Sequence, residues 1–191
     1  MLESSGVPLE IENVDTDQII PARFLKATER KDFGKNLFRD WRYDQDNTPK
    51  KDFILNSKTY NGKILVAGKN FGSGSSREHA VWAIYDYGFR CVISSFFADI
   101  FKNNCLNIGV LPVQISAEFL KLIFNSIKKS PSVKLKVNLI DQEVSISGNS
   151  RKEKFEINPY KKENMINGFD DIDYLLNMKS EIKNFANKKP F

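Results

Sequence analysis

Cysteine is scarce in this chain of 191 residues. Cys91 lies in an apolar run typical of a strand, and Cys105 lies in a segment with helical spacing. Two cysteines support neither a disulfide framework nor a cysteine-based zinc cluster. We therefore predict that both are buried thiols.

Long hydrophobic runs and blocks of one charge are also missing. No apolar run approaches the roughly 20 residues of a membrane-spanning helix. Met1 to Glu12 carries two serines, a glycine and a proline, unlike a secretory signal segment. The formal net charge is +5, but lysines and acids alternate along the chain. We therefore expect a cytoplasmic protein that binds neither membranes nor nucleic acid.

Apolar residues, by contrast, are plentiful enough for one sizeable core. They make up 41% of the chain, and aromatic residues make up 12%. The length is also in the range of single domains. We predict one domain over residues 1–191, with a frayed tail from about residue 186.

The middle of the chain has the pattern of a parallel α/β unit. Short apolar runs predict buried strands at residues 63–66, 91–95 and 109–113. Apolar residues at helical spacing predict helices at residues 76–87, 97–106 and 117–129. Strand and helix therefore alternate, which is typical of a parallel sheet.

The pattern changes after Pro131. The strings VKLKVNLI, QEVSISG and KFEIN alternate apolar and polar residues, which indicates antiparallel strands. Asp170 to Lys189 returns to helical spacing. The predicted fold class is α/β, with a parallel sheet flanked by helices and additional antiparallel strands.

A glycine-rich loop follows the strand predicted at 63–66. Gly68, Gly72 and Gly74 allow the backbone to approach a ligand at a helix N-terminus, where negative charge is favoured. No lysine follows the last glycine, and Arg77 stands where a dinucleotide motif needs its third glycine. The loop predicts an anion site, with a nucleotide as the less favoured ligand.

Ser75, Ser76 and Arg77 stand at the predicted helix start. Two hydroxyls and a guanidinium, which can grip a carboxylate bidentately, suit a small carboxylate. Helix capping by the serines would be the preferred interpretation of an isolated GSS string.

Two strings overturn that preference. GSSREHA, residues 74–80, resembles the substrate-binding loop of aconitases and isopropylmalate dehydratases. NVDTDQIIPARFL, residues 13–25, resembles a signature near the start of the small subunits of the same enzymes. Weaker similarity extends over nearly the whole chain, through residues 33–43, 86–113 and 165–172. The chain thus resembles the small subunits of bacterial 3-isopropylmalate dehydratase, in the aconitase superfamily.

The sequence departs from that pattern at two positions. Ser73 stands where bacterial relatives often carry cysteine, and Val81 where they often carry proline. Neither departure touches the residues to which the resemblance assigns chemistry.

The resemblance implies a fold, an activity and residue roles. The fold is an aconitase-like swivelling β/β/α domain. The activity interconverts 2-isopropylmalate and 3-isopropylmalate through isopropylmaleate, in leucine biosynthesis. Ser75 would be the catalytic base, acting as an alkoxide, while Ser76, Arg77 and Gly74 would bind the substrate. A helix N-terminus, backbone amides and a guanidinium would all favour the alkoxide.

The resemblance also implies a large subunit as partner and a small dicarboxylate as substrate. One histidine and two cysteines give this chain no cluster of metal ligands. We therefore expect no metal here and a [4Fe-4S] cluster on the large subunit.

The sequence does not decide the roles of three further parts of the chain. Asp15 and Asp17 belong to a loop that the resemblance places near the active site, where they either cap or tie the loop or line the site. For His79 we favour packing or a bond to a carbonyl over catalysis. Leu25 to Phe33 corresponds to the loop that helps relatives to distinguish substrates.

Three alternatives stay open. The chain could be the small subunit of another aconitase-like dehydratase, for homoaconitate or a methylated malate. It could be a phosphate- or nucleotide-binding module. It could also be a non-catalytic partner protein that uses the loop only as a helix cap.

Overall fold

The computed structural model describes residues 1–25 and 33–188, and the chain forms two compact units, Met1–Glu156 and Ile157–Phe191. The first unit carries the sheet and the predicted site. The second unit consists of helices. One domain over residues 1–191 stays a prediction.

A seven-stranded mixed sheet organises the first unit, in the order β4-β3-β2-β1-β5-β6-β7. Strands β1 to β4 are parallel, whereas β5 to β7 add to β1 in antiparallel fashion. The strands are β1 (Leu2–Leu9), β2 (Ile64–Ala67), β3 (Cys91–Ser94), β4 (Leu111–Gln114), β5 (Lys134–Asn138), β6 (Glu143–Ile146) and β7 (Lys152–Lys154). The predicted combination of parallel and antiparallel strands is confirmed.

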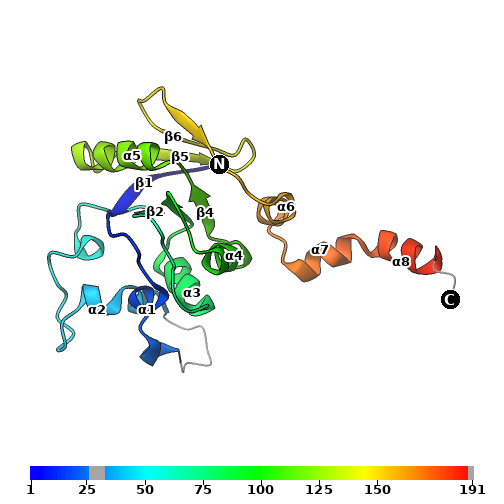
Figure 1. Ribbon diagram of the computed structural model, residues 1–191, viewed down its shortest axis with the longest axis horizontal. Helices are drawn as coiled ribbons and strands as arrows, with labels where there is room; N and C mark the ends of the chain where they lie inside the picture. Colours follow the sequence, from blue (N-terminus) through cyan, green and yellow to red (C-terminus); the bar gives the residue numbers. More distant parts are fainter. Residues whose placement is uncertain (26–32, 189–191) are drawn as a thin grey trace. The chain divides into compact units, whose positions relative to one another are not determined.

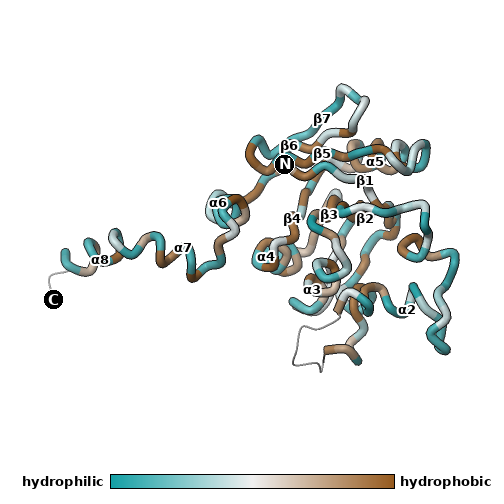
Figure 2. The backbone as a smooth tube through the Cα atoms, turned by 180° about the vertical axis from the view of Figure 1, so that it is seen from behind, coloured by the Kyte–Doolittle hydropathy of each residue, from teal (hydrophilic) through white to brown (hydrophobic). Residues whose placement is uncertain are grey.

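Helices cover both faces of this sheet (Figure 1). Alternate strand residues point to opposite faces, and Leu65 and Val92 join the core on the side of α3 (Glu78–Tyr87) and α4 (Asp99–Ile108). The helix α5 (Ala117–Lys129) lies on the other face, at the bounds predicted, and turns five apolar side chains inward. Figure 2 shows the corresponding hydrophobic stretches along the strands.

Short helical turns connect β1 to β2. They are α1 (Thr16–Ile19), η1 (Ala22–Phe24), η2 (Phe33–Asn36), α2 (Arg39–Arg42) and η3 (Ile54–Asn56). Residues 26–32 of the loop that we associated with substrate choice lie outside the described residues.

The sequence analysis missed β1, although this strand lies at the centre of the sheet. Ser4 and Ser5 are buried there, but each is satisfied: Ser4 Oγ accepts from Lys63 N at 2.8 Å, and Ser5 Oγ donates to Asn61 O at 2.6 Å. Pro8 lies opposite Val66 of β2, but the Leu9 carbonyl accepts from Gly68 N, so it is the backbone groups of Leu9 that point to β2 and those of Pro8 point to the other side. There β5 pairs only with residues 2–5, so the missing amide hydrogen of Pro8 disrupts no strand pairing. Contacts with distant residues therefore stabilise β1, whose polar residues do not give the apolar pattern of a buried strand.

Several boundaries differ from the predictions; β4 and α4, for example, begin two residues later than predicted, at Leu111 and Asp99. Two other differences concern β7 and α3. The strand expected at KFEIN is wrong, because the strand is β7 and ends at Lys154, after which Phe155 turns into the core. The helix expected from Ser76 begins at Glu78 instead. The cause of this second difference lies in the site.

The second unit contains α6 (Pro159–Asn167), α7 (Asp171–Asn177) and α8 (Lys179–Lys188). Asp170 caps α7 through a capping box with Asp173. The predicted C-terminal helical pattern is thus two helices separated at Met178, and α8 extends to Lys188. In residues 1–25 and 33–188, no helix has both the length and the apolar character needed to span a membrane.

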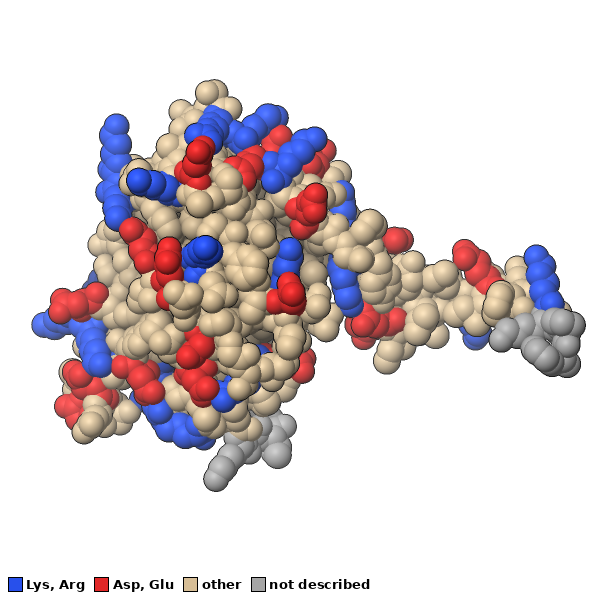
Figure 3. All heavy atoms as spheres, viewed as in Figure 1, with Lys and Arg blue, Asp and Glu red and all other residues tan. Residues whose placement is uncertain are grey.

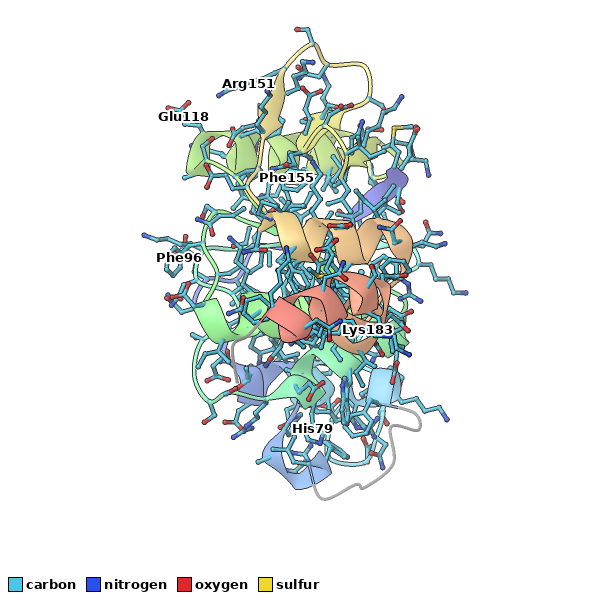
Figure 4. All side chains as sticks on the ribbon, turned by 90° about the vertical axis from the view of Figure 1, so that its right-hand side faces the viewer. His79, Phe96, Glu118, Arg151, Phe155 and Lys183 are labelled. Atoms are coloured by element: carbon cyan, nitrogen blue, oxygen red, sulfur yellow. The ribbon has the colours of Figure 1, made fainter. Side chains whose placement is uncertain are left out.

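Charges are mixed on the face shown in Figure 3, where Lys and Arg alternate with Asp and Glu. One such pair, Arg151 and Glu118, is labelled in Figure 4 and has a nitrogen-to-oxygen distance of 3.3 Å.

Candidate active site

The site forms where the parallel strands β1 and β2 end. Leu9 pairs with Ala67 at the carboxyl end of both strands, so the segments that follow start side by side. Backbone hydrogen bonds then join them: Gly72 N donates to Val14 O at 2.8 Å, and Thr16 N donates to Ser73 O at 2.9 Å. The two strings that carried the resemblance therefore form one structure.

Glycine is required at the bend of the loop. Gly72 has φ +81°, and a Cβ atom there would lie 2.1 Å from Cγ of Phe101. Gly74 has φ +87°. Residues with side chains rarely adopt this left-handed backbone, so both glycines set the path of the chain toward Ser75.

Thr16 explains the late start of α3. Its Oγ1 donates to the carbonyl oxygen of Ser75 at 2.9 Å. In a helix that began at Ser76, that carbonyl would accept from the amide four residues later. Because the tertiary bond holds it, Ser75 and Ser76 stay in the loop and α3 begins at Glu78.

Neither serine caps α3. Its N-cap is Arg77, with no side-chain capping bond. Ser75 and Ser76 are exposed, and their hydroxyls make no hydrogen bond to any residue in the described part of the chain. Capping thus does not account for these hydroxyls, which are open to a ligand.

A cavity of about 250 Å³ lies over the loop. It brings together the four residues predicted to act on the substrate with one residue of α1 and the first turn of α4. The lining residues are Thr16, Gly72, Gly74, Ser75, Ser76, Arg77, Ala98, Asp99, Ile100 and Phe101.

Arg77 is fixed by an ion pair with Asp17, made through its Nη1 atom. The Arg77 side chain is only 16% exposed, whereas that of Asp17 is 51% exposed. The Arg77 side chain makes no other hydrogen bond to residues 1–25 and 33–188. Nε and Nη2 therefore remain for a ligand carboxylate, because a guanidinium carries five N–H donors.

Asp15 and Asp17, which the sequence left unresolved, have different contacts. Asp15 is the N-cap of α1: Oδ1 accepts from Gln18 N at 2.7 Å, and Gln18 Oε1 accepts from Asp15 N at 2.9 Å. Asp15 therefore caps α1, whereas Asp17 forms an ion pair with Arg77, which lines the cavity.

His79 packs against aromatic rings, as we favoured from the sequence. Its ring centroid lies 4.6 Å from that of Trp82 and 5.5 Å from that of Phe33. Figure 4 shows its place on the chain.

The sequence analysis did not include Thr16 and the first turn of α4 in the site. A signal was present for α4, because it follows the third parallel strand, and carboxyl ends of parallel strands share one edge of a sheet. No local pattern marked Thr16, whose contact with Ser75 spans 59 positions.

The comparisons with known proteins agree with this geometry. The model of the aconitase C-terminal domain family matches residues 2–118, a range that contains the whole cavity. A 3-isopropylmalate dehydratase small subunit from Cytophaga hutchinsonii is 62% identical over 182 residues, covering 95% of this chain and 90% of the relative. The chain belongs to the family of 3-isopropylmalate dehydratase small subunits.

Two further relatives are similar over nearly the whole length of this chain. The small subunit from Azobacteroides pseudotrichonymphae is 59% identical and covers 96% of this chain and 94% of the relative. The crystal structure of 3-isopropylmalate dehydratase from Methanocaldococcus jannaschii is 26% identical, with a TM-score of 0.68 and coverage of 95% of this chain and 97% of that one. The recognised family and the aconitase-like fold are confirmed.

The cysteines of this small subunit do not fit an iron–sulfur cluster. Cys91 and Cys105 are buried, as predicted, and burial raises the pKa of both thiols. Iron–sulfur clusters are typically held by four cysteine thiolates, and this chain has only two cysteines. In the described part of the chain, no group of three or more His, Cys, Asp or Glu residues is placed to hold a metal ion.

Proposed function

We propose that this chain is the small subunit of a hydro-lyase that interconverts 2-isopropylmalate and 3-isopropylmalate through isopropylmaleate, in leucine biosynthesis. The observation that carries the proposal is the pair of exposed hydroxyls of Ser75 and Ser76, which have no hydrogen-bond partner among the described residues, beside the guanidinium of Arg77 that Asp17 holds. Relatives named 3-isopropylmalate dehydratase small subunit support the choice of substrate.

Ser75 is the proposed base. Dehydration removes a proton from the carbon next to a carboxylate, and the Ser75 oxygen, as an alkoxide, would accept it. The hydroxyl on the neighbouring carbon leaves as hydroxide, and the Lewis acid that this requires would be supplied by the cluster of the proposed large subunit. Arg77 supplies the positive charge that favours this alkoxide in a partly closed cavity. The helix dipole contributes less than the sequence suggested, because α3 begins three residues after Ser75.

Ser76, Arg77 and Gly74 are the proposed carboxylate-binding residues. The free Nε and Nη2 donors of Arg77 suit a bidentate carboxylate, and the Ser76 hydroxyl adds a further donor. Asp17 orients the guanidinium from the opposite side. A carboxylate fixed in this way would determine which proton faces Ser75.

A large subunit is the proposed partner and carries the proposed [4Fe-4S] cluster. The name "small subunit" of the relatives implies such a partner. Since the cysteines of this chain do not fit a cluster, its own proposed tasks are proton transfer and carboxylate binding. We place the assembled enzyme in the cytoplasm.

The deciding experiment is anaerobic reconstitution with the large subunit from the same organism. We expect conversion of 2-isopropylmalate by the pair and by neither subunit alone. Faster conversion of homoaconitate or a methylated malate would favour another dehydratase. A nucleotide that raises the melting temperature where 2-isopropylmalate does not would favour the phosphate-binding alternative.

A further inference from the structure

The two walls of the small cavity differ in chemistry. The loop wall carries Ser75, Ser76 and Arg77. The facing wall is the first turn of α4, where Ala98, Ile100 and Phe101 present apolar surface. A ligand that fills this cavity therefore meets mostly polar groups from the loop, and hydrocarbon with one carboxylate, that of Asp99, from α4.

Phe101 is the rigid part of the apolar wall. It is 2% exposed, packs over Gly72, and lies edge-on to Phe71 with 5.4 Å between ring centroids. Ile100 is the adaptable part, because 54% of this large apolar residue is exposed although it lines the cavity. Such an exposed side chain gains free energy when an apolar group covers it.

The charges of the cavity fix the orientation of a dicarboxylate. Among the described residues that line it, Arg77 is the only cation and Asp99 the only anion. Asp99 stands in the first turn of α4. Arg77 therefore draws a carboxylate to the loop wall, while the Asp99 carboxylate offsets the attraction that the N-terminus of α4 would otherwise have for an anion. This leaves the apolar substituent of the substrate facing Ile100.

We propose that Ile100 is a specificity-determining residue, whose side chain contacts the branched alkyl substituent of the dicarboxylate held at Arg77. This inference rests on the proposed function. The resemblance implies that residues 25–33 also influence substrate choice, and Ile100 would add a determinant on α4, which follows β3. The volume of about 250 Å³ suits a small branched acid, because pockets for drug-sized ligands are roughly 300–1,000 Å³.

The test compares two substrates that differ only in the substituent. The reconstituted enzyme is assayed with 2-isopropylmalate and with 2-methylmalate, and the ratio of their kcat/KM values is measured. Ile100→Ala should lower this ratio at least about 10-fold, since a methylene in an apolar pocket changes discrimination by roughly 10–200-fold. Ile100→Leu keeps the apolar volume and should stay within about threefold of the wild type.

Phe96→Ala is the matched control. Phe96 is 46% exposed and precedes the same helix, but it does not line the cavity. Figure 4 shows that it lies well apart from His79. Its loss should leave the substrate ratio unchanged, whatever its effect on assembly with the large subunit.

Two results would overturn the assignment of Ile100 while leaving the proposed function in place. One is an Ile100→Ala enzyme whose ratio stays within twofold of the wild type. The other is a variant that loses kcat/KM equally for both substrates, since that pattern indicates general packing or assembly. A wild-type pair that does not turn over 2-isopropylmalate would instead overturn the proposed function.

Discussion

Two cavities of this protein differ in size and in chemistry. The larger, of about 1140 Å³, lies beside α2 and is lined mostly by charged and polar side chains that already have partners. Arg23 pairs with Asp40, and Lys50 Nζ lies 3.7 Å from Asp44 Oδ1. The smaller, of about 250 Å³, is lined by Ser75 and Ser76, whose hydroxyls bond to no residue in the described ranges 1–25 and 33–188.

Volume therefore does not identify the site. In the larger cavity, acids and bases neutralise each other, and the Arg23 guanidinium lowers the pKa of Asp40 by hydrogen bonding. A ligand would have to displace these pairs. In the smaller cavity the two serines are held by the backbone of the loop and Arg77 by Asp17, and all three have bonding capacity left, which is what preorganised chemistry requires. The following predictions test this difference.

Removal of the Ser75 hydroxyl should have the largest effect on turnover. Ser75→Ala should lower kcat by about 10²- to 10⁴-fold, the usual contribution of a positioned base. The fold should persist, because the structural bond at this position uses the Ser75 carbonyl and not its side chain. Steady-state kinetics of the reconstituted enzyme and circular dichroism measure the two effects.

Thr48→Ala is the corresponding hydroxyl deletion in the larger cavity. It should leave kcat and KM at the wild-type values. Normal turnover by Ser75→Ala would show that the base assignment is wrong. A large loss from Thr48→Ala would show that the larger cavity takes part in the reaction.

Arg77→Lys should primarily weaken substrate binding. The lysine keeps the charge but loses the planar fork, with roughly 2 to 5 kcal/mol at stake if the ion pair is desolvated. Part of the effect should appear in kcat, because a misplaced carboxylate also misplaces the proton that Ser75 removes. An unchanged Michaelis constant in steady-state kinetics would disprove the carboxylate clamp.

Substitution of Asp17 should affect substrate binding, whereas substitution of Asp15 should affect the stability of the fold. Asp17→Asn weakens the ion pair with Arg77 and should raise KM by about 10-fold, or about 1.4 kcal/mol. Asp15→Ala removes the cap of α1 and should lower the free energy of unfolding by about 1 kcal/mol. Steady-state kinetics and urea denaturation are measured for both variants. Equal changes in KM and in the free energy of unfolding for the two variants would contradict the separate roles of Asp15 and Asp17.

Local patterns in the sequence predicted the parallel strands and the loop, because each is encoded by neighbouring residues. The strands β2, β3 and β4 lie within two residues of the predicted runs. The bends at Gly72 and Gly74 follow from the residue type itself. The candidate site residues Gly74, Ser75, Ser76 and Arg77 are contiguous and line one cavity.

The features that the sequence did not reveal depend on distant partners. The strand β1 carries buried serines whose hydroxyls are satisfied by backbone atoms 56 and 59 positions away. The start of α3 depends on Thr16, and the orientation of Arg77 depends on Asp17, 60 positions away. No window of neighbouring residues contains such contacts.

Breaking the Arg23–Asp40 pair should have the smallest effect, because both side chains are more than half exposed. A double-mutant cycle with Arg23→Ala and Asp40→Ala should give a coupling energy below about 1 kcal/mol at neutral pH. The folded pKa of Asp40 is lowered, so the pair stabilises the fold above the unfolded pKa of about 3.9. The coupling should then disappear as the pH falls below that value through the folded pKa. Urea denaturation at several pH values measures this coupling energy. A coupling that grew on acidification would contradict the ion pair between Arg23 and Asp40 in the larger cavity.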